Sequence, residues 1–450
     1  MGTVRLLKTK FNGSLTVVLY ILAVVILLLP FHAFLSVWAS SIIGHYTSTR
    51  LWKEGLVFIA AIIAISWLIT DKKVRQQVLS SKLAWLILAY VALDLILAVF
   101  AYKGKHVSGK ALAYGLLIDL RFLGMFVIAW AAAVKSTVLN KDWQKLILWP
   151  AVIVILFGLL QMSILPANFL SHFGYGPKTI MPYETINNNP NYVRILSTLR
   201  GADPLGAYLI LPISALAVLL IARFKAKRAD YLRLLLLLGA VVVLYGSYSR
   251  AAWIGAVLAV AVVAGSLIRK EWILKYRNYL IASVITLSVI IVAGVVLLAS
   301  SHSFQNIIYH TQSGSSASVS SNQAHLTALK DGISTVTHHP LGSGPGSSGP
   351  ASVYNHYRPA SIAENYFLTV GEESGWLGMG LFIAINSYVA VLLWQRRKSP
   401  FALTLLASFI GITFVNLLSI GWSDDTLSYI WWGLAGLCIA TEPDVSKEKV

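Results

Sequence analysis

Long apolar runs separated by short polar stretches dominate the pattern of this chain. A helix needs about 20 consecutive apolar residues to cross the hydrocarbon core of a bilayer. The pattern predicts twelve membrane-spanning helices, at residues 15–35, 55–69, 83–101, 111–134, 146–165, 204–222, 232–246, 251–268, 279–300, 374–394, 402–418 and 427–440. The expected fold is therefore an all-α integral membrane protein in which residues 1–450 form a single polytopic domain.

The composition supports this interpretation. Hydrophobic residues make up 57% of the chain and charged residues only 12%, with a mean hydropathy of +0.71. A soluble domain has about 25% charged residues. The single cysteine, Cys438, falls in the last predicted span, so no disulfide can form within the chain.

Basic residues are distributed unevenly between the two sets of loops. If the N-terminus is cytoplasmic, 24 of the 36 Lys and Arg residues lie on the cytoplasmic side, 11 lie on the other side, and Arg121 lies within a span. This bias follows the positive-inside rule and predicts that both termini are cytoplasmic. The net charge of +18 therefore indicates contact with anionic membrane lipids, and no nucleic-acid partner is expected.

Two connections, 166–203 and 301–361, are much longer than the others, and both fall on the predicted outer face. Loops above about 12–15 residues tend to be functional or disordered. The second contains a run at 325–336 with helical apolar spacing, followed by a stretch rich in Gly and Pro. We expect these loops to form a lid over a site at the extracytoplasmic end of the bundle.

Three arginines stand near this end. Arg194 and Arg200 precede the sixth span, and Arg250 opens the eighth. Arginine binds phosphate through a planar fork of donors and keeps its charge. Together these arginines can hold a pyrophosphate, whereas the alternative is that they anchor helix ends at the lipid headgroups.

Carboxylates and histidines cluster in the same predicted region. Glu364, Glu372 and Glu373 precede or enter the tenth span, and His338 and His339 lie in the outer loop. Adjacent residues on a helix do not face each other, so at most one of Glu372 and Glu373 can join Glu364 in a site. The histidines are either catalytic groups or solvated loop residues.

Charged residues within the membrane need partners. Asp94 and Arg121 lie in successive spans and are expected to pair, with Arg121 a further candidate for facing the substrate. The glycine-rich loop 342–346 has no helix obviously following it and contains a proline, so a hinge is favoured over a phosphate cradle. The sequence has no Walker loop and no metal-ligand spacing of His and Cys, and we expect no metal or cofactor.

Four segments combine the arginines, histidines, carboxylates and glycines described above: RILSTLRGADPLGAYL (194–209), SYSRAAWIG (247–255), HLTALKDGISTVTHHPLGSGPG (325–346) and ENYFLTVGEESGWLG (364–378). These segments resemble motifs of the O-antigen ligase and polymerase superfamily of bacterial membrane glycosyltransferases. Their order, spacing and predicted side of the membrane match the family. At the fourth, ligases of the family usually carry histidine where this chain has Glu364, whereas Asn365 and the following Gly-x-x-Gly are kept.

The resemblance implies a protein of the bacterial cytoplasmic membrane. It implies metal-independent, inverting transfer of a glycan from an undecaprenyl-pyrophosphate donor to a lipid, glycan or protein acceptor. Arg250 and one of Arg194 and Arg200 would bind the pyrophosphate, with Arg121 as a further candidate. Glu364, at the family's histidine position, would activate the acceptor as a base, with Asn365 and Glu373 in supporting roles. The alternative is that Glu364 only caps the tenth span and that His338, His339 or Glu373 is the base.

Other functions remain open at this point. Within the superfamily, the alternatives to a ligase are a polysaccharide polymerase and a protein glycan ligase. A secondary transporter or lipid flippase also has about twelve spans, but it should place its polar groups near the midplane on broken helices. Here most of the polar groups lie towards the outer end of the predicted spans.

Overall fold

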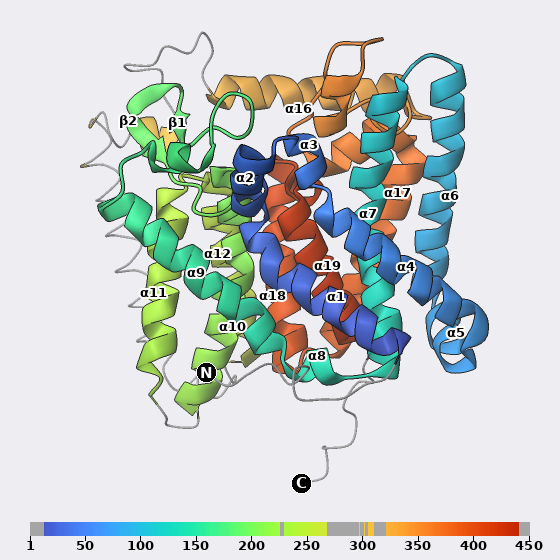
Figure 1. Cartoon of the computed structure of the whole chain (residues 1–450), viewed down its shortest axis with the longest axis horizontal. Helices are drawn as coiled ribbons and strands as arrows, with labels where there is room; N and C mark the ends of the chain where they lie inside the picture. Colours follow the sequence, from blue (N-terminus) through green and yellow to red (C-terminus); the bar gives the residue numbers. More distant parts are fainter. Residues whose placement is uncertain are drawn as a thin grey trace.

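The computed structural model describes residues 13–225, 229–267 and 321–440, together with Leu297, Ser301 and 305–309. Helices account for 78% of the structure, as expected for an all-α membrane protein (Figure 1). The helices are α1 (Ser14–Leu28), α2 (His32–Ile43), α3 (Tyr46–Thr49), α4 (Trp52–Thr70), α5 (Lys72–Leu79), α6 (Lys82–Lys103), α7 (Gly109–Lys135), α8 (Val138–Lys141), α9 (Trp143–Ser163), α10 (Ala202–Lys225), α11 (Tyr231–Gly246), α12 (Arg250–Leu267), α16 (Ser321–His338), α17 (Tyr366–Gln395), α18 (Pro400–Leu418) and α19 (Asp425–Ile439).

Nine of the predicted spans are confirmed as helices long and apolar enough to cross a membrane, within the part of the chain that the structure describes. The first of them runs through α1, a 3-10 turn containing Pro30 and then α2. Two further predictions correspond to the shorter helices α11 and α19. The predicted span 279–300 lies outside the described residues, apart from Leu297.

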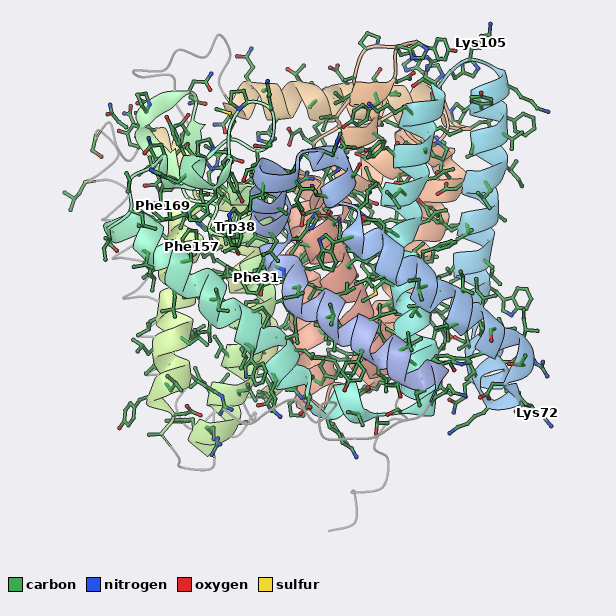
Figure 2. All side chains as sticks on the ribbon, in the orientation of Figure 1. Phe31, Trp38, Lys72, Lys105, Phe157 and Phe169 are labelled. Carbon is green, nitrogen blue, oxygen red and sulfur yellow. The ribbon has the colours of Figure 1, made fainter. Side chains whose placement is uncertain are left out.

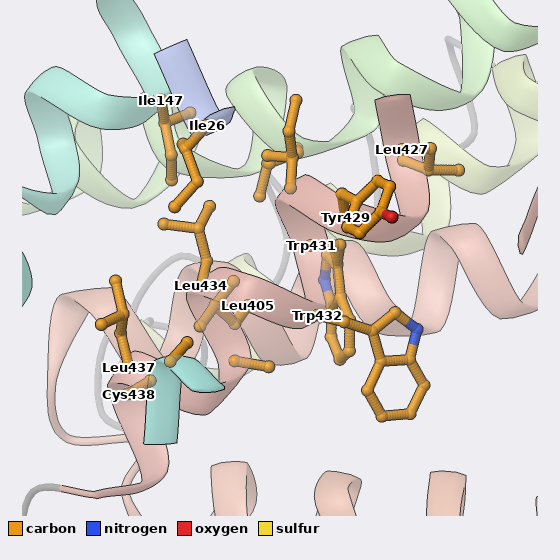
Figure 3. Packing of buried hydrophobic residues seen from close by; sticks show 14 of the residues in the cluster. Ile26, Ile147, Leu405, Leu427, Tyr429, Trp431, Trp432, Leu434, Leu437 and Cys438 are labelled. Carbon is orange, nitrogen blue, oxygen red and sulfur yellow. The ribbon is translucent and has the colours of Figure 1, made fainter. Parts of the chain in front are cut away.

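Helix α19 forms the centre of the bundle, because nearly every residue along it is buried. It packs on α7 and also contacts α1, α10, α17 and α18. Figure 3 shows Trp431 and Trp432 of α19 in this core, together with Ile26 of α1 and Leu405 of α18. A helix that is apolar on all sides is stable when other helices surround it, which explains how a helix of 15 residues serves as the core.

The two long loops lie at the same end of the bundle. In Figure 1, α16 and a small hairpin lie at one end, and α5 and α8 lie at the other. Figure 2 shows Lys105 at the first end and Lys72 at the second. The described parts of the two long connections therefore lie at the end that carries α16, which we call the loop end.

The hairpin adds a feature that the all-α prediction did not contain. It consists of β1 (Glu184–Ile186) and β2 (Asn189–Arg194), paired antiparallel with Glu184 opposite Arg194. Asn187 and Asn188 both have positive φ, at 51° and 59°. Tight hairpin turns favour Asn and Gly at such positions, so the local sequence accounts for the turn.

A glycine-rich segment, residues 342–346, packs against a kink in α17 and holds it in place. Gly375 breaks the helix with φ 66° and ψ −169°, and a Cβ there would lie 2.3 Å from the carbonyl oxygen of Pro340. The amides of Ser343 and Gly344 donate to the carbonyls of Glu372 and Glu373, each at 2.8 Å. These N–H groups are therefore used in packing, which supports a structural role for the loop 342–346 and argues against a phosphate cradle.

Candidate functional site

A pocket of about 490 Å³ opens at the loop end. We call it the Glu364 pocket. One part of its wall is polar and another part is apolar. It is lined by Arg194, Asp203, Tyr248, Ser249, Arg250, Asn322, His325, Glu364 and Ser419, and by Ala251, Ile254, Leu326, Leu329, Val415, Leu417 and Leu418.

Arg194 ends strand β2 and ties three elements together. Its Nε donates to the carbonyl oxygen of Ser247 at 2.9 Å, and its Nη2 lies 2.7 Å from Asp203 Oδ1. Its Nη1 lies 3.7 Å from Glu184 Oε2. Burial raises the pKa of Glu184, and the nearby Arg194 opposes this rise. Since two carboxylates share the guanidinium, much of its charge is already balanced.

Arg250 begins α12 and reaches across to α16. Its Nη2 donates to Asn322 Oδ1 at 2.7 Å. This contact orients the guanidinium, and the nearby carboxylate of Asp203 also acts on its charge. The preceding turn is tight, with Tyr248 at φ 50°. Arg250 and Arg194 thus both bring a guanidinium to the pocket wall.

Glu364 forms an ion pair with a histidine that the sequence did not single out as catalytic. Its Oε2 lies 3.2 Å from Nδ1 of His325 on α16. The hydrogen bond that His325 donates to the Glu364 carboxylate raises the pKa of His325 above its usual value of 6.5, against the opposing effect of burial. Both side chains remain partly exposed, at 44% for His325 and 37% for Glu364. The pair is thus accessible from the pocket.

The backbone at Glu364 is strained. Its φ is 54°, in the left-handed region that residues with a Cβ seldom adopt. The next residue, Asn365, caps α17 by accepting from the amide of Leu368, and its amide group donates to the carbonyl of Leu417. Asn365 therefore fixes the start of α17 against the end of α18, which holds Glu364 at the pocket in its strained conformation.

Arg200 and Arg121, which the sequence grouped with the pyrophosphate ligands, lie elsewhere. Both line a second, smaller pocket of about 140 Å³, which we call the Arg200 pocket. Arg200 Nε lies 3.2 Å from Asp424 Oδ2. Only Arg194 and Arg250 of the four predicted arginines line the Glu364 pocket.

The predicted pair of Asp94 and Arg121 is not present. Asp94 accepts a short hydrogen bond from Ser374. Arg121 donates to the carbonyl of Ser423 at 2.6 Å and lies 4.0 Å from Glu54 Oε1. Sequence proximity of the two spans indicated the pair, but the rotation of each helix directs the two side chains to different neighbours.

The remaining predicted site residues also lie outside the Glu364 pocket. His338 and His339 are exposed at the C-terminal end of α16, and the helical rise puts His338 about 20 Å along the axis from His325. Glu373 is buried, and its Oε1 accepts from the amides of Gly346 and Ser348 at 2.8 and 3.3 Å. Glu373 thus holds the glycine-rich loop against α17.

His325, Asn322 and Asp203 are pocket residues that the sequence reasoning did not assign. Asn322 and His325 lie on the face of α16 that also carries Leu326 and Leu329, since these positions follow the i, i+3, i+4, i+7 spacing. The sequence could have indicated Asn322 and His325, because they are polar residues on an otherwise apolar helix face. No comparable signal marked Asp203, whose pairing with Arg194 depends on the hairpin.

The fold and the pocket define a polytopic membrane protein with arginines and a carboxylate–histidine pair at one end of its bundle. Residues 234–383, a third of the chain, match the family described as O-Antigen ligase. The matched segment includes Arg250, His325 and Glu364, whereas Arg194 lies before it. The resemblance to an O-antigen ligase-like family is confirmed over this segment, which supports a membrane enzyme of the ligase or polymerase type. No curated protein matches the chain.

Proposed function

We propose that this protein is a glycosyltransferase that moves a glycan from an undecaprenyl-pyrophosphate donor to an acceptor at the extracytoplasmic face. The observation that carries the proposal is the shared pocket of Arg250, Arg194, Glu364 and His325. The pocket combines phosphate-binding donors with a group able to take a proton. A transfer from a lipid pyrophosphate needs both.

The arrangement of the pocket wall suits a donor with an anionic head and an apolar tail. Arg250 binds the pyrophosphate through its planar fork, and Arg194 contributes the part of its charge that its carboxylates leave unbalanced. Leu326, Leu417 and Leu418 are about half exposed and offer the tail an apolar surface. We assign no pyrophosphate contact to Arg200 or Arg121, because they line the other pocket.

The proposed reaction is a single displacement at the anomeric carbon. The acceptor hydroxyl oxygen attacks this carbon opposite the leaving group, so the configuration inverts. The bond from the carbon to the pyrophosphate oxygen breaks, and the pyrophosphate keeps the electron pair, stabilised by Arg250. The hydroxyl proton passes to the pair of Glu364 and His325. No metal is assigned a step.

The test is transfer by the full chain, purified and reconstituted in lipid with an undecaprenyl-pyrophosphate-linked glycan. Glu364→Gln keeps the side-chain volume but removes the proton acceptor. Transfer should fall by about 10²–10⁴-fold, while donor binding is retained. Asp331→Asn is a matched control, since Asp331 is an exposed carboxylate on α16 outside the pocket. Equal transfer by Glu364→Gln and Asp331→Asn would refute the role of Glu364.

A further inference from the structure

The Arg200 pocket differs from the Glu364 pocket in size and in lining. Its volume of about 140 Å³ is close to that of a cavity of about 150 Å³ that holds one benzene ring. It therefore has room for about one ring, and the rest of a larger ligand has to lie outside it. The α2–α4 region, α7, the start of α19 and the turn η5 (Gly349–Tyr354) surround it.

Most of the charges in this pocket are balanced internally. Lys53 is buried between Glu54 Oε1 at 3.1 Å and Asp425 Oδ2 at 2.9 Å. Glu54 also faces Arg121. Arg200 pairs with a carboxylate at the start of α19, as described above. Three cations are thus matched by three carboxylates.

Arg50 is the fourth cation, and its neighbours are aromatic. Its guanidinium carbon lies 5.3 Å from the centre of the Tyr114 ring. Among the residues that the structure describes, no carboxylate forms an ion pair with Arg50. Counting histidine as neutral, the pocket therefore carries one excess positive charge, which favours an anionic ligand.

The pocket wall also contains unmet hydrogen-bonding capacity of both kinds. Arg121 Nε is a buried donor and Glu54 Oε2 is a buried acceptor, and neither has a hydrogen-bond partner in the described structure. Buried polar atoms normally have partners, from protein, ligand or water. Both atoms are closed off from solvent in this structure, so a ligand reaches them only if the side chains shift.

Two tyrosines complete the lining. Tyr114 and Tyr354 stack with their ring centres 4.8 Å apart and an angle of 25° between the planes. Arg50 lies over the Tyr114 ring, and Lys110 Nζ lies 4.2 Å from the centre of the Tyr354 ring. The two tyrosines therefore offer a ligand their ring edges and hydroxyl groups, which suit the hydroxyls of a sugar.

The two pockets are close along the chain. Arg194 lines one and Arg200 lines the other. The chain between them cannot extend beyond about 20 Å, a distance that a short oligosaccharide spans. A short oligosaccharide is therefore long enough to reach from one arginine to the other.

We propose that the Arg200 pocket binds one anionic sugar residue, a six-membered ring bearing a carboxylate or a phosphate. The assignment of this sugar to the acceptor glycan rests on the proposed function, whereas the binding itself does not. Arg50 contacts the anionic group, and Tyr354 contacts the ring.

The experiment measures binding of small sugars to the purified full chain by titration calorimetry. The probes are galacturonate and glucose 1-phosphate. The controls are galactose, which has the ring without the anionic group, and inorganic phosphate, which has the anion without the ring. Both anionic sugars should bind at least tenfold more tightly than either control. Equal affinity for galactose or for inorganic phosphate would overturn the proposal, because the pocket would then not recognise the combination.

Variants locate the binding. Arg50→Gln should weaken binding of both anionic sugars about tenfold or more, since a hydrogen bond to a charged group contributes about that much. Arg358→Gln is the control, because Arg358 is an exposed arginine outside the pocket. Tyr354→Leu is the second variant, should Arg50→Gln fail to fold, and it should also weaken binding. Unchanged affinity in the folded variants would overturn the proposal.

Two further measurements are needed. The first distinguishes an anionic sugar from a lipid headgroup as the ligand, and the second distinguishes this proposal from the proposed function. Vesicles of phosphatidylglycerol should not displace galacturonate, and displacement would identify a lipid headgroup as the ligand instead. Binding of the undecaprenyl-pyrophosphate donor should be unchanged in Arg50→Gln and reduced in Arg250→Ala. Loss of donor binding in Arg50→Gln would overturn the separation of the two pockets. A chain that binds galacturonate but transfers no glycan would refute the proposed function alone.

Discussion

His325 Nδ1 and Glu364 Oε2 lie 3.2 Å apart, although the two residues belong to different structural elements and are separated by the glycine-rich loop. The pair joins α16 to the start of α17 within one pocket. A carboxylate that fixes the orientation of an imidazole is a common arrangement for moving a proton. The contact raises the pKa of His325, and this yields the first prediction.

The rate of transfer should rise with pH through the pKa of His325. Below that pKa, His325 is charged and forms an ion pair with Glu364. Above it, His325 has lost its proton, so the pair can accept the proton of the acceptor hydroxyl. Glu364 raises the pKa of His325, so replacing Glu364 with Gln should move the midpoint of the residual activity to lower pH, towards 6.5. The measurement is a pH–rate profile of each protein.

The control for this profile is His338→Gln, because His338 lies on the same helix but is exposed and outside the pocket. It should leave the midpoint unchanged. A midpoint that shifts in His338→Gln and not in Glu364→Gln would contradict the role of the pair. The ion pair also affects the stability of the fold. It stabilises the fold while His325 is protonated, and this contribution disappears as pH rises through the raised pKa of His325.

Arg250 and Arg194 should respond differently to substitution. Arg250→Lys keeps the charge but loses the planar fork, so donor binding should weaken by about tenfold or more, with little change in melting temperature. Arg194→Lys should chiefly lower stability, by about 1–2 kcal/mol, because Asp203 and Glu184 lose well-placed partners. Donor titration and thermal unfolding of both variants distinguish the two effects. If Arg194→Lys chiefly weakened donor binding and Arg250→Lys chiefly lowered stability, Arg194 would be the main phosphate ligand.

Strain at Glu364 predicts a difference between two truncated variants. Glycine adopts a φ of 54° without a steric cost, whereas alanine does not. Glu364→Gly should therefore be about 1 kcal/mol more stable than Glu364→Ala, and both should lose transfer. Chemical unfolding of the two proteins measures the difference. Equal stability would mean that the backbone at this position relaxes when the side chain is removed.

Gly375 and Gly380 provide a matched pair within α17. A Cβ on Gly375 would meet the carbonyl of Pro340 at 2.3 Å, and its φ is 66°. A Cβ on Gly380 has nothing within 4 Å. Gly375→Ala should lower stability by about 2 kcal/mol or more, whereas Gly380→Ala should be neutral or stabilising by up to about 1 kcal/mol. Similar melting temperatures for the two variants would contradict the role of the close contact between Gly375 and the glycine-rich segment.

The orientation in the membrane can be tested with cysteines at opposite ends of the bundle. After replacement of Cys438, cysteine at exposed Ser171 or Lys105 should react with an impermeant thiol reagent in whole cells. Cysteine at Lys72, at the other end (Figure 2), should react only after the membrane is opened. Ser348 is buried and bonded to Glu372, so it is not a useful position. Labelling of Lys72 alone would invert the proposed topology.

The sequence by itself determined where most helices begin and end. In lipid each backbone must satisfy its own hydrogen bonds, so a span is a local property of an apolar run. The positions of the long loops and of arginines near the helix ends followed for the same reason. Arg250 and Glu364 were assigned correctly to one region, since each stands at the start of a helix at the loop end.

Only the tertiary structure decided which of these side chains share a pocket. Arg194 and Arg200 are six positions apart, yet β2 ends at one and the turn into α10 directs the other to the Arg200 pocket. His325 reaches Glu364 because α16 packs on α17. Contacts between helices depend on how each helix rotates and packs against its neighbours, and these are properties of the whole bundle that no local stretch of sequence encodes.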